Sequence, residues 1–123
     1  MILDSNIVIY SIVPEYENLR NFLKEKEYEL AVSVITKLEV LGYHRLAQDE
    51  KEILTHFFAV TRKIPISEAI LEKAIYLKQL KKMSIGDAII AATAILENDI
   101  LLTNNEEDFE NIEGLRVKPM KSI

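Results

Sequence analysis

Cysteine is absent from this chain of 123 residues, and glycine and proline occur only three times each. Without cysteine the chain can form no disulfide framework, no thiolate zinc site and no cysteine nucleophile. The scarcity of glycine and proline, together with 49% hydrophobic residues, excludes a disordered or low-complexity protein. We therefore expect a single packed domain over residues 1–123, in a reducing compartment such as the cytoplasm.

Long apolar runs and targeting segments are also missing. No stretch approaches the ~20 apolar residues that a membrane-spanning helix needs. Met1 is followed by neither a basic segment nor a signal-peptide cleavage site. The net charge is −5, which argues against binding nucleic acid through overall charge but leaves open a site where bound metal ions offset the repulsion. These features predict a cytoplasmic protein with no membrane partner.

Three common kinds of catalytic motif are absent as well. His44 and His56 lack the partner spacing of a zinc site. The three glycines are isolated, so no glycine-rich loop could hold a phosphate, and no serine lies in a nucleophile elbow. Chemistry at this protein would have to come from other groups.

Short apolar runs alternate with helical patterns along the chain. Strands are expected at residues 1–3, 28–32, 63–66, 99–103 and 115–118. Amphipathic helices are expected at 7–13 (ended by Pro14), 15–27, 33–47, 49–60 and 67–82. The segment after Ser84, IGDAIIAATAILEN, is apolar on nearly every side and predicts a buried helix. This alternation predicts an α/β fold around a largely parallel sheet.

Acidic and amide side chains recur where an apolar element meets a turn. Asp4 ends the first expected strand, Glu39 lies one turn into the helix after the second strand, and Asp87 lies in the first turn of the buried helix. Asn105 and Asp108 follow the strand at 99–103. Because ligands of open parallel sheets bind outside the carboxyl ends of the strands, we expect several of these side chains to gather there.

Two explanations compete for these acids. Taken singly, each is better explained as a helix cap or as a favourable partner of a helix dipole. However, Glu39 borders an apolar stripe that includes Leu38, and Asp87 shares a side of its helix with Ala91 and Ala94. No lysine or arginine follows on those faces, so converging carboxylates would repel one another and need a cation. Oxygen ligands alone favour Mg²⁺ or Mn²⁺.

Four motifs in this order resemble those of the PIN domain, specifically the small VapC-like toxin ribonucleases of prokaryotic toxin–antitoxin pairs. They are Leu3-Asp4-Ser5-Asn6, Thr36-x-x-Glu39, the segment GDAIIAATA at 86–94, and Leu102-Thr103-Asn104-Asn105-x-x-Asp108-Phe109. The match covers nearly the whole chain. It implies a three-layer α/β/α fold with a largely parallel central sheet.

The resemblance also implies roles for the residues of these motifs. Asp4, Glu39 and Asp87 would be catalytic and would bind one or two Mg²⁺ or Mn²⁺ ions. Ser5 and Asn6 would orient Asp4 and nearby waters.

The fourth motif departs from the family pattern. Many relatives carry an acid where this chain has Asn105, and in others Asp108 is the fourth catalytic acid. Thr103 precedes both in the same motif. Which of Asn105 and Asp108 supports the metal stays open at this point.

The function implied is metal-dependent hydrolysis of RNA phosphodiester bonds by the toxin of a type II toxin–antitoxin system. The family also implies a homodimer and a cognate antitoxin protein as partners. Candidate contacts to the RNA backbone are Lys37, Arg45, Lys81 and Lys82. The main alternative is a catalytically silent PIN-fold module that binds a protein, and a phosphate-handling receiver-type domain ranks last.

Overall fold

Five short strands form the centre of the computed structural model, which describes residues 1–123. They are β1 (Ile2–Leu3), β2 (Ala31–Ser33), β3 (Arg62–Ile64), β4 (Ile100–Thr103) and β5 (Arg116–Pro119). Every pairing is parallel, and the spatial order is β3-β2-β1-β4-β5. From β1 the chain adds β2 and β3 on one side and then β4 and β5 on the other side. The switch point of the topology therefore lies between β1 and β4.

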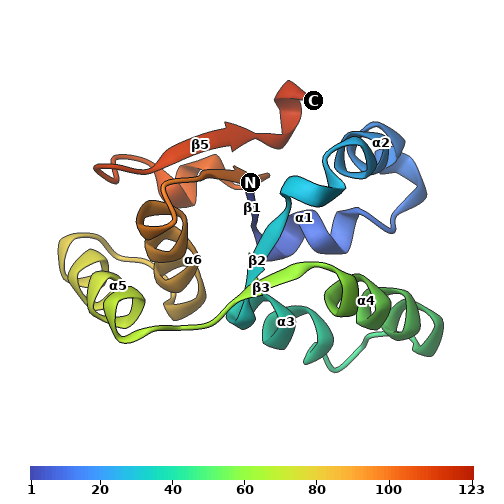
Figure 1. Cartoon of the computed structure of the whole chain (residues 1–123), viewed down its shortest axis with the longest axis horizontal. Helices are drawn as coiled ribbons and strands as arrows, with labels where there is room; N and C mark the ends of the chain where they lie inside the picture. Colours follow the sequence, from blue (N-terminus) through green and yellow to red (C-terminus); the bar gives the residue numbers. More distant parts are fainter.

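Six α-helices surround this sheet, with short 3₁₀ turns between the elements (Figure 1). The helices are α1 (Ser5–Tyr10), α2 (Glu17–Glu25), α3 (Val34–Leu41), α4 (Gln48–Val60), α5 (Glu68–Leu80) and α6 (Ile85–Leu96). Figure 1 shows α5 and α6 on one side of the strands and α1 to α4 on the other. None of these helices has the length and hydropathy to cross a bilayer.

Neighbouring residues of each strand face opposite layers, because side chains alternate along a strand. Ile2 and Leu101 join a core with α5 and α6, whereas Leu3 and Leu102 join a second core with α1, α2 and α4. All four side chains are fully buried. Two cores on the two faces of a parallel sheet confirm the predicted three-layer α/β/α fold.

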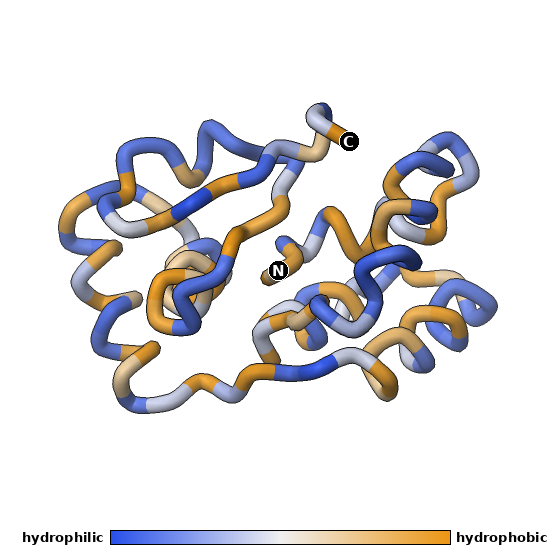
Figure 2. The backbone as a smooth tube through the Cα atoms, turned by 45° about the horizontal axis from the view of Figure 1, so that its top comes forward, coloured by the Kyte–Doolittle hydropathy of each residue, from blue (hydrophilic) through white to orange (hydrophobic).

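The helices differ in how much of their surface the sheet covers. Outer helices alternate between hydrophilic and hydrophobic residues along the tube of Figure 2, as amphipathic helices do. In α6, by contrast, every residue from Ala88 to Ala94 is buried, with α5 packed alongside. The prediction of a buried helix after Ser84 is therefore confirmed.

The predicted first helix and second strand were placed wrongly. The first helix begins at Ser5, because Asp4 caps it, and it ends at Tyr10; Pro14 begins a 3₁₀ turn rather than ending the helix. Tyr28 is 96% exposed in a 3₁₀ turn, and the second strand begins only at Ala31.

Two later boundaries were also wrong. The helix from residue 33 ends at Leu41 rather than Ala47. Gly42 is the C-cap residue, so the last helical turn ends just before it. The third strand ends at Ile64, since Pro65 has no amide hydrogen to continue the ladder.

Candidate active site

Asp4 lies at the switch point of the sheet, directly after β1. Leu3 pairs with Leu102 in the neighbouring strand, so Asp4 and Thr103 stand side by side at the carboxyl edge. The Thr103 hydroxyl donates to Oδ2 of Asp4 at 2.7 Å, and the Ser5 amide donates to Oδ1 at 2.8 Å. Asp4 therefore caps α1 and also holds a fixed place among groups from two strands.

Keeping the Asp4 carboxylate ionised costs free energy. Its side chain is 5% exposed, and burial raises its pKa above the usual range. The hydrogen bonds from Thr103 and Ser5 lower that pKa, while Glu39 and Asp108 raise it further. The Asp4 carboxylate is thus held in place by two donors but is opposed by two other negative groups.

Glu39 reaches the same region from α3. Its Oε1 accepts a hydrogen bond from the Ser5 hydroxyl at 2.6 Å, and Thr36 Oγ1 lies 3.4 Å from that hydroxyl. Its Oε2 faces Gly86 at the beginning of α6.

The expected apolar stripe beside Glu39 is only partly buried: Leu41 and Leu46 pack against the second core, but Leu38 does not. Leu38 is 66% exposed, and the buried side chains of α3 are Thr36 and Val40. Glu39 is itself exposed, so it reaches the site across the surface of α3 rather than from the edge of a core.

Asp87 enters from the first turn of α6, where the Ser84 hydroxyl caps the helix by accepting from the Asp87 amide at 3.1 Å. Partial burial and then repulsion by Asp4 and Asp108 raise its pKa from 3.8 to about 6. The Ser84 hydrogen bond lowers this value, but burial and repulsion dominate. Asp87 therefore takes up a proton at a higher pH than an ordinary aspartate does.

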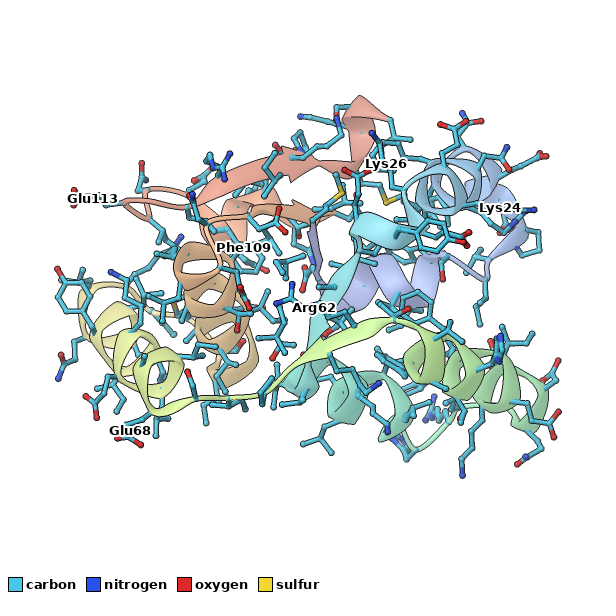
Figure 3. The ribbon with its side chains drawn as sticks, viewed as in Figure 1. Lys24, Lys26, Arg62, Glu68, Phe109 and Glu113 are labelled. Carbon is cyan, nitrogen blue, oxygen red and sulfur yellow. The ribbon has the colours of Figure 1, made fainter.

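Asp108 faces Asp87 across a pocket of about 480 Å³. It lies in the 3₁₀ turn Glu106–Phe109, which Phe109 anchors by packing into the core beside α6 (Figure 3). Asn105 begins this turn, and its amide donates to Thr103 Oγ1 at 2.9 Å. Asp108 raises the pKa of both Asp4 and Asp87, so among the two fourth-motif candidates it is the one that joins the carboxylate group.

Several other predicted residues make no hydrogen bond or ion pair to the carboxylates. The Asn6 side chain makes no hydrogen bond to Asp4, so the orienting groups are Ser5 and Thr103 instead. Lys81 donates to the backbone carbonyls of Glu110 at 2.8 Å and Glu107 at 3.4 Å. Lys37 and Arg45 are exposed and take part in no ion pair.

The chemistry of the donor set fits a hard cation. None of the four ion pairs of the protein involves Asp4, Glu39, Asp87 or Asp108, so no lysine or arginine lies within ion-pair distance of them. All their ligating atoms are oxygens, which Mg²⁺ and Mn²⁺ prefer. No three of them stand close enough together to form a preassembled metal cluster.

Sequence reasoning missed Gly86 and the bond between Ser5 and Glu39. A glycine in the first turn of a helix costs about 1 kcal/mol relative to alanine, and that unexplained cost was the one available signal. The Ser5–Glu39 bond joins two helices, so no local pattern could show it.

The protein is a parallel α/β domain, a class in which ligands bind at the switch point of the sheet, where these carboxylates lie. The family model for the PIN domain matches residues 1–115. The chain therefore belongs to the PIN domain family, and the resemblance noted in the sequence is confirmed. A search of curated proteins found no match.

Solved structures with the same fold include several toxin–antitoxin complexes. A chain of a toxin–antitoxin complex from Klebsiella pneumoniae is 30% identical, with a TM-score of 0.81 and coverage of 97% of this chain and 96% of that one. A chain of VapBC2 from Rickettsia felis bound to a promoter DNA fragment is 23% identical, with a TM-score of 0.81 and 96% coverage of both chains. A DNA-bound VapBC from Salmonella typhimurium is 19% identical, with a TM-score of 0.83 and coverage of 97% and 96%.

Proposed function

We propose that this PIN domain protein is a Mg²⁺- or Mn²⁺-dependent endoribonuclease and the toxin of a type II toxin–antitoxin pair. The observation that carries the proposal is the group of four carboxylates without a cationic partner, set at the switch point of a parallel sheet. Repulsion of this kind is costly in a folded protein, and a bound divalent cation would remove it. The similarity to chains of toxin–antitoxin complexes supports the biological role.

In this proposal, Asp4, Glu39 and Asp87 would hold the cation, and Asp108 would contribute the fourth negative group. When bound, the cation would lower the pKa of a coordinated water and stabilise the charge that develops on the phosphodiester. Thr103 and the Ser5 amide fix both oxygens of Asp4, and the Ser5 hydroxyl fixes Glu39. Asp87, with its pKa of about 6, can hold or release a proton near neutral pH at the same edge.

RNA would reach these carboxylates past a rim of positive charge. Lys82 lines the Asp87–Asp108 pocket and is exposed, so it is available to a phosphate. Lys81 lines the same pocket but is engaged with two backbone carbonyls. We therefore assign phosphate contact to Lys82 rather than Lys81.

A groove on the other side of the molecule fits the expected antitoxin. It measures about 680 Å³ between α2 and α4, and its walls combine apolar side chains such as Leu23, Ile53 and Phe57 with two basic residues, Arg20 and Lys24, and one acidic residue, Glu27. A groove of this composition would accept an amphipathic segment of the partner, with acidic residues beside the basic ones. The basic side chain of Lys24 is labelled on α2 in Figure 3.

A homodimer in the cytoplasm completes the proposal. Exposed apolar side chains on the outer face of α5, namely Leu71, Ile75, Tyr76 and Leu80, offer a surface for self-association. Measurement of molecular mass in solution, for the wild type and for Ile75→Glu, would test this part by itself.

The first experiment is calorimetric titration of Mn²⁺ into the wild type, Asp4→Asn and a matched control, Asp49→Asn. Asp49 lies exposed in the first turn of α4, so its substitution removes one charge far from the site. We expect Mn²⁺ binding and RNA cleavage by the wild type and the control, and neither by Asp4→Asn. Absence of Mn²⁺ binding by the wild type would leave the acids as caps and favour the silent protein-binding module.

A further inference from the structure

Gly86 occupies the second position of α6 without needing the freedom of a glycine backbone. The only glycine with a positive φ is Gly114, so the conformation of Gly86 is one that any residue adopts. Helix propensity favours alanine over glycine here. A reason for glycine must therefore come from what surrounds the position where a Cβ atom would lie.

The Glu39 carboxylate occupies that space. A Cβ atom at residue 86 would lie 2.3 Å from Oε2, 2.9 Å from Cδ and 3.2 Å from Oε1 of Glu39. The first two distances are too short for any real contact, so a methyl group and the present position of this carboxylate exclude each other. Apart from the chain neighbours of Gly86 and the backbone of its own helix, these are the three nearest atoms to the added Cβ atom.

The opposite end of the contact is fixed by a hydrogen bond. Oε1 of Glu39 accepts from the Ser5 hydroxyl at 2.6 Å, a length typical of a bond to a charged acceptor. Ser5 follows Asp4, and Gly86 precedes Asp87. The carboxylate of Glu39 is thus held between the immediate neighbours of the two other proposed ligands.

We propose that Gly86 and Ser5 are positioning residues that place the Glu39 carboxylate for the cation, Gly86 by the absence of a side chain and Ser5 by its hydroxyl. This inference rests on the proposed function, since it concerns how the third ligand is placed. Glu39 is a long, exposed side chain, so it can swing away from an added methyl group at little cost to the fold. Alanine at residue 86 should therefore displace the Glu39 carboxylate without destabilising the fold.

Calorimetry with Mn²⁺ and thermal unfolding separate these two effects. Gly86→Ala should keep or raise Tm, because alanine favours the helix, while Mn²⁺ affinity falls about tenfold or more. Ile85→Ala is the matched control: Ile85 is 65% exposed in the same turn, and its substitution should leave Mn²⁺ affinity unchanged. A Gly86→Ala protein with a lower Tm but the wild-type Mn²⁺ affinity would show that Gly86 contributes only to packing. That result would overturn the proposal.

A double-mutant cycle tests whether the effect runs through Glu39. In a Glu39→Ala background, Gly86→Ala should cause no further loss of Mn²⁺ affinity, because the displaced carboxylate is already gone. An equal loss in both backgrounds would rule out the positioning role. Ser5→Ala should weaken Mn²⁺ binding, and Ser5→Thr, which keeps a hydroxyl, should restore it; a failure to restore binding argues against the hydroxyl.

The position of Glu39 can also be followed without metal. The carbon-13 NMR signal of the Glu39 carboxyl group should shift in Gly86→Ala but not in Ile85→Ala. If the wild type binds no Mn²⁺, the proposed function fails, and this spectrum still decides whether Gly86 places the carboxylate. An unchanged Glu39 signal in Gly86→Ala overturns the inference whatever the metal measurements show.

Discussion

Thr103 donates its buried hydroxyl to Oδ2 of Asp4 at 2.7 Å, and this bond joins the ends of the two central strands. Both side chains are nearly inaccessible to solvent, so water cannot replace the donor. The bond favours the ionised form of a carboxylate whose pKa burial raises. Thr103 therefore stabilises a negative charge that burial, Glu39 and Asp108 oppose.

Replacing Thr103 by valine should cost stability in a pH-dependent way. A hydrogen bond to a charged group contributes about 2 kcal/mol, and valine keeps the shape of threonine while removing both the donor to Asp4 and the acceptor of the Asn105 amide. Because the lost bond favours the ionised carboxylate, the pKa of Asp4 should rise further, and the loss of stability should be larger at pH 7 than at pH 4. Urea unfolding at both pH values measures the effect.

Thr103→Ser provides the control for this experiment, since it keeps the hydroxyl and removes only a methyl group. Equal losses of stability in Thr103→Ser and Thr103→Val would mean that packing, and not the hydrogen bond, is what Thr103 supplies.

Asp87→Asn should stabilise the metal-free protein at neutral pH. The folded-state pKa of about 6 lies above the unfolded value of 3.8, so the folded state binds more protons between these values. Stability therefore falls as pH rises from about 4 to about 6, and asparagine removes this fall. Because the Asp87 carboxyl is half-buried and solvent screens the repulsion, the expected gain at pH 7 is about 1 kcal/mol.

Chemical unfolding in the presence of a chelator, from pH 4 to pH 8, measures this gain. The exposed Asp49→Asn variant should follow the wild-type curve. A pH profile of Asp87→Asn that parallels that of the wild type would contradict the raised pKa.

Mn²⁺ affinity should itself depend on pH. Carboxylate ligands must lose their protons to bind a metal, so affinity should fall about tenfold for each pH unit below the Asp87 pKa of about 6. Titrations at pH 5, 6 and 7 measure the slope. Constant affinity over this range would place Asp87 outside the set of ligands.

The fourth acidic group can be assigned by a pair of exchanges. Asp108 acts on both Asp4 and Asp87 and shares a pocket with Asp87, whereas Asn105 contributes its backbone to Thr103. We therefore expect Asp108→Asn to weaken Mn²⁺ binding and Asn105→Asp to leave it nearly unchanged. A gain of affinity or activity in Asn105→Asp would instead identify residue 105 as a missing ligand.

Lys81 and Lys82 should differ although they are neighbours. Lys82→Gln should weaken RNA binding and reduce the slope of log K against log salt by about 0.7, as expected for one lost contact to single-stranded phosphate. Its Mn²⁺ affinity should stay at the wild-type value. Lys81→Gln releases the end of the turn that carries Asp108, so it should weaken Mn²⁺ binding too. The same response of both variants would contradict the assignment.

Much of the fold follows from the order of apolar runs along the chain. Strands buried on both faces are apolar at successive residues, as Ile2 and Leu3 are, so they stand out between amphipathic helices. Their boundaries do not, because strands of two to four residues are too short for any periodicity to mark where they begin. Tyr28 has a high strand propensity but is exposed, since the chain turns there before the strand.

The carboxylates could be identified from the sequence because each follows an apolar element in a motif shared with a known family. The contacts that hold these carboxylates in place could not be identified from the sequence. Gly86 is explained by a side chain from α3, and the Thr103 hydroxyl by a carboxylate at the opposite end of the sequence. Such contacts arise when the sheet brings its strand ends together, and local patterns carry no trace of them. The prediction that Leu38 belongs to a core-facing stripe was wrong for the same reason, because a helical wheel cannot show which side of the helix the sheet covers.

The four carboxylates do not come from one side of the molecule. Asp4 and Glu39 belong to elements that pack on the α1–α4 layer, and Asp87 and Asp108 to elements that pack on the α5–α6 layer. Between these layers lie only strands of two to four residues. Mutual repulsion of the carboxylates therefore pushes the two layers apart at one edge of the sheet. A positive charge placed there would attract the carboxylates of both layers. A cation bound at that edge would therefore link the two layers of the domain.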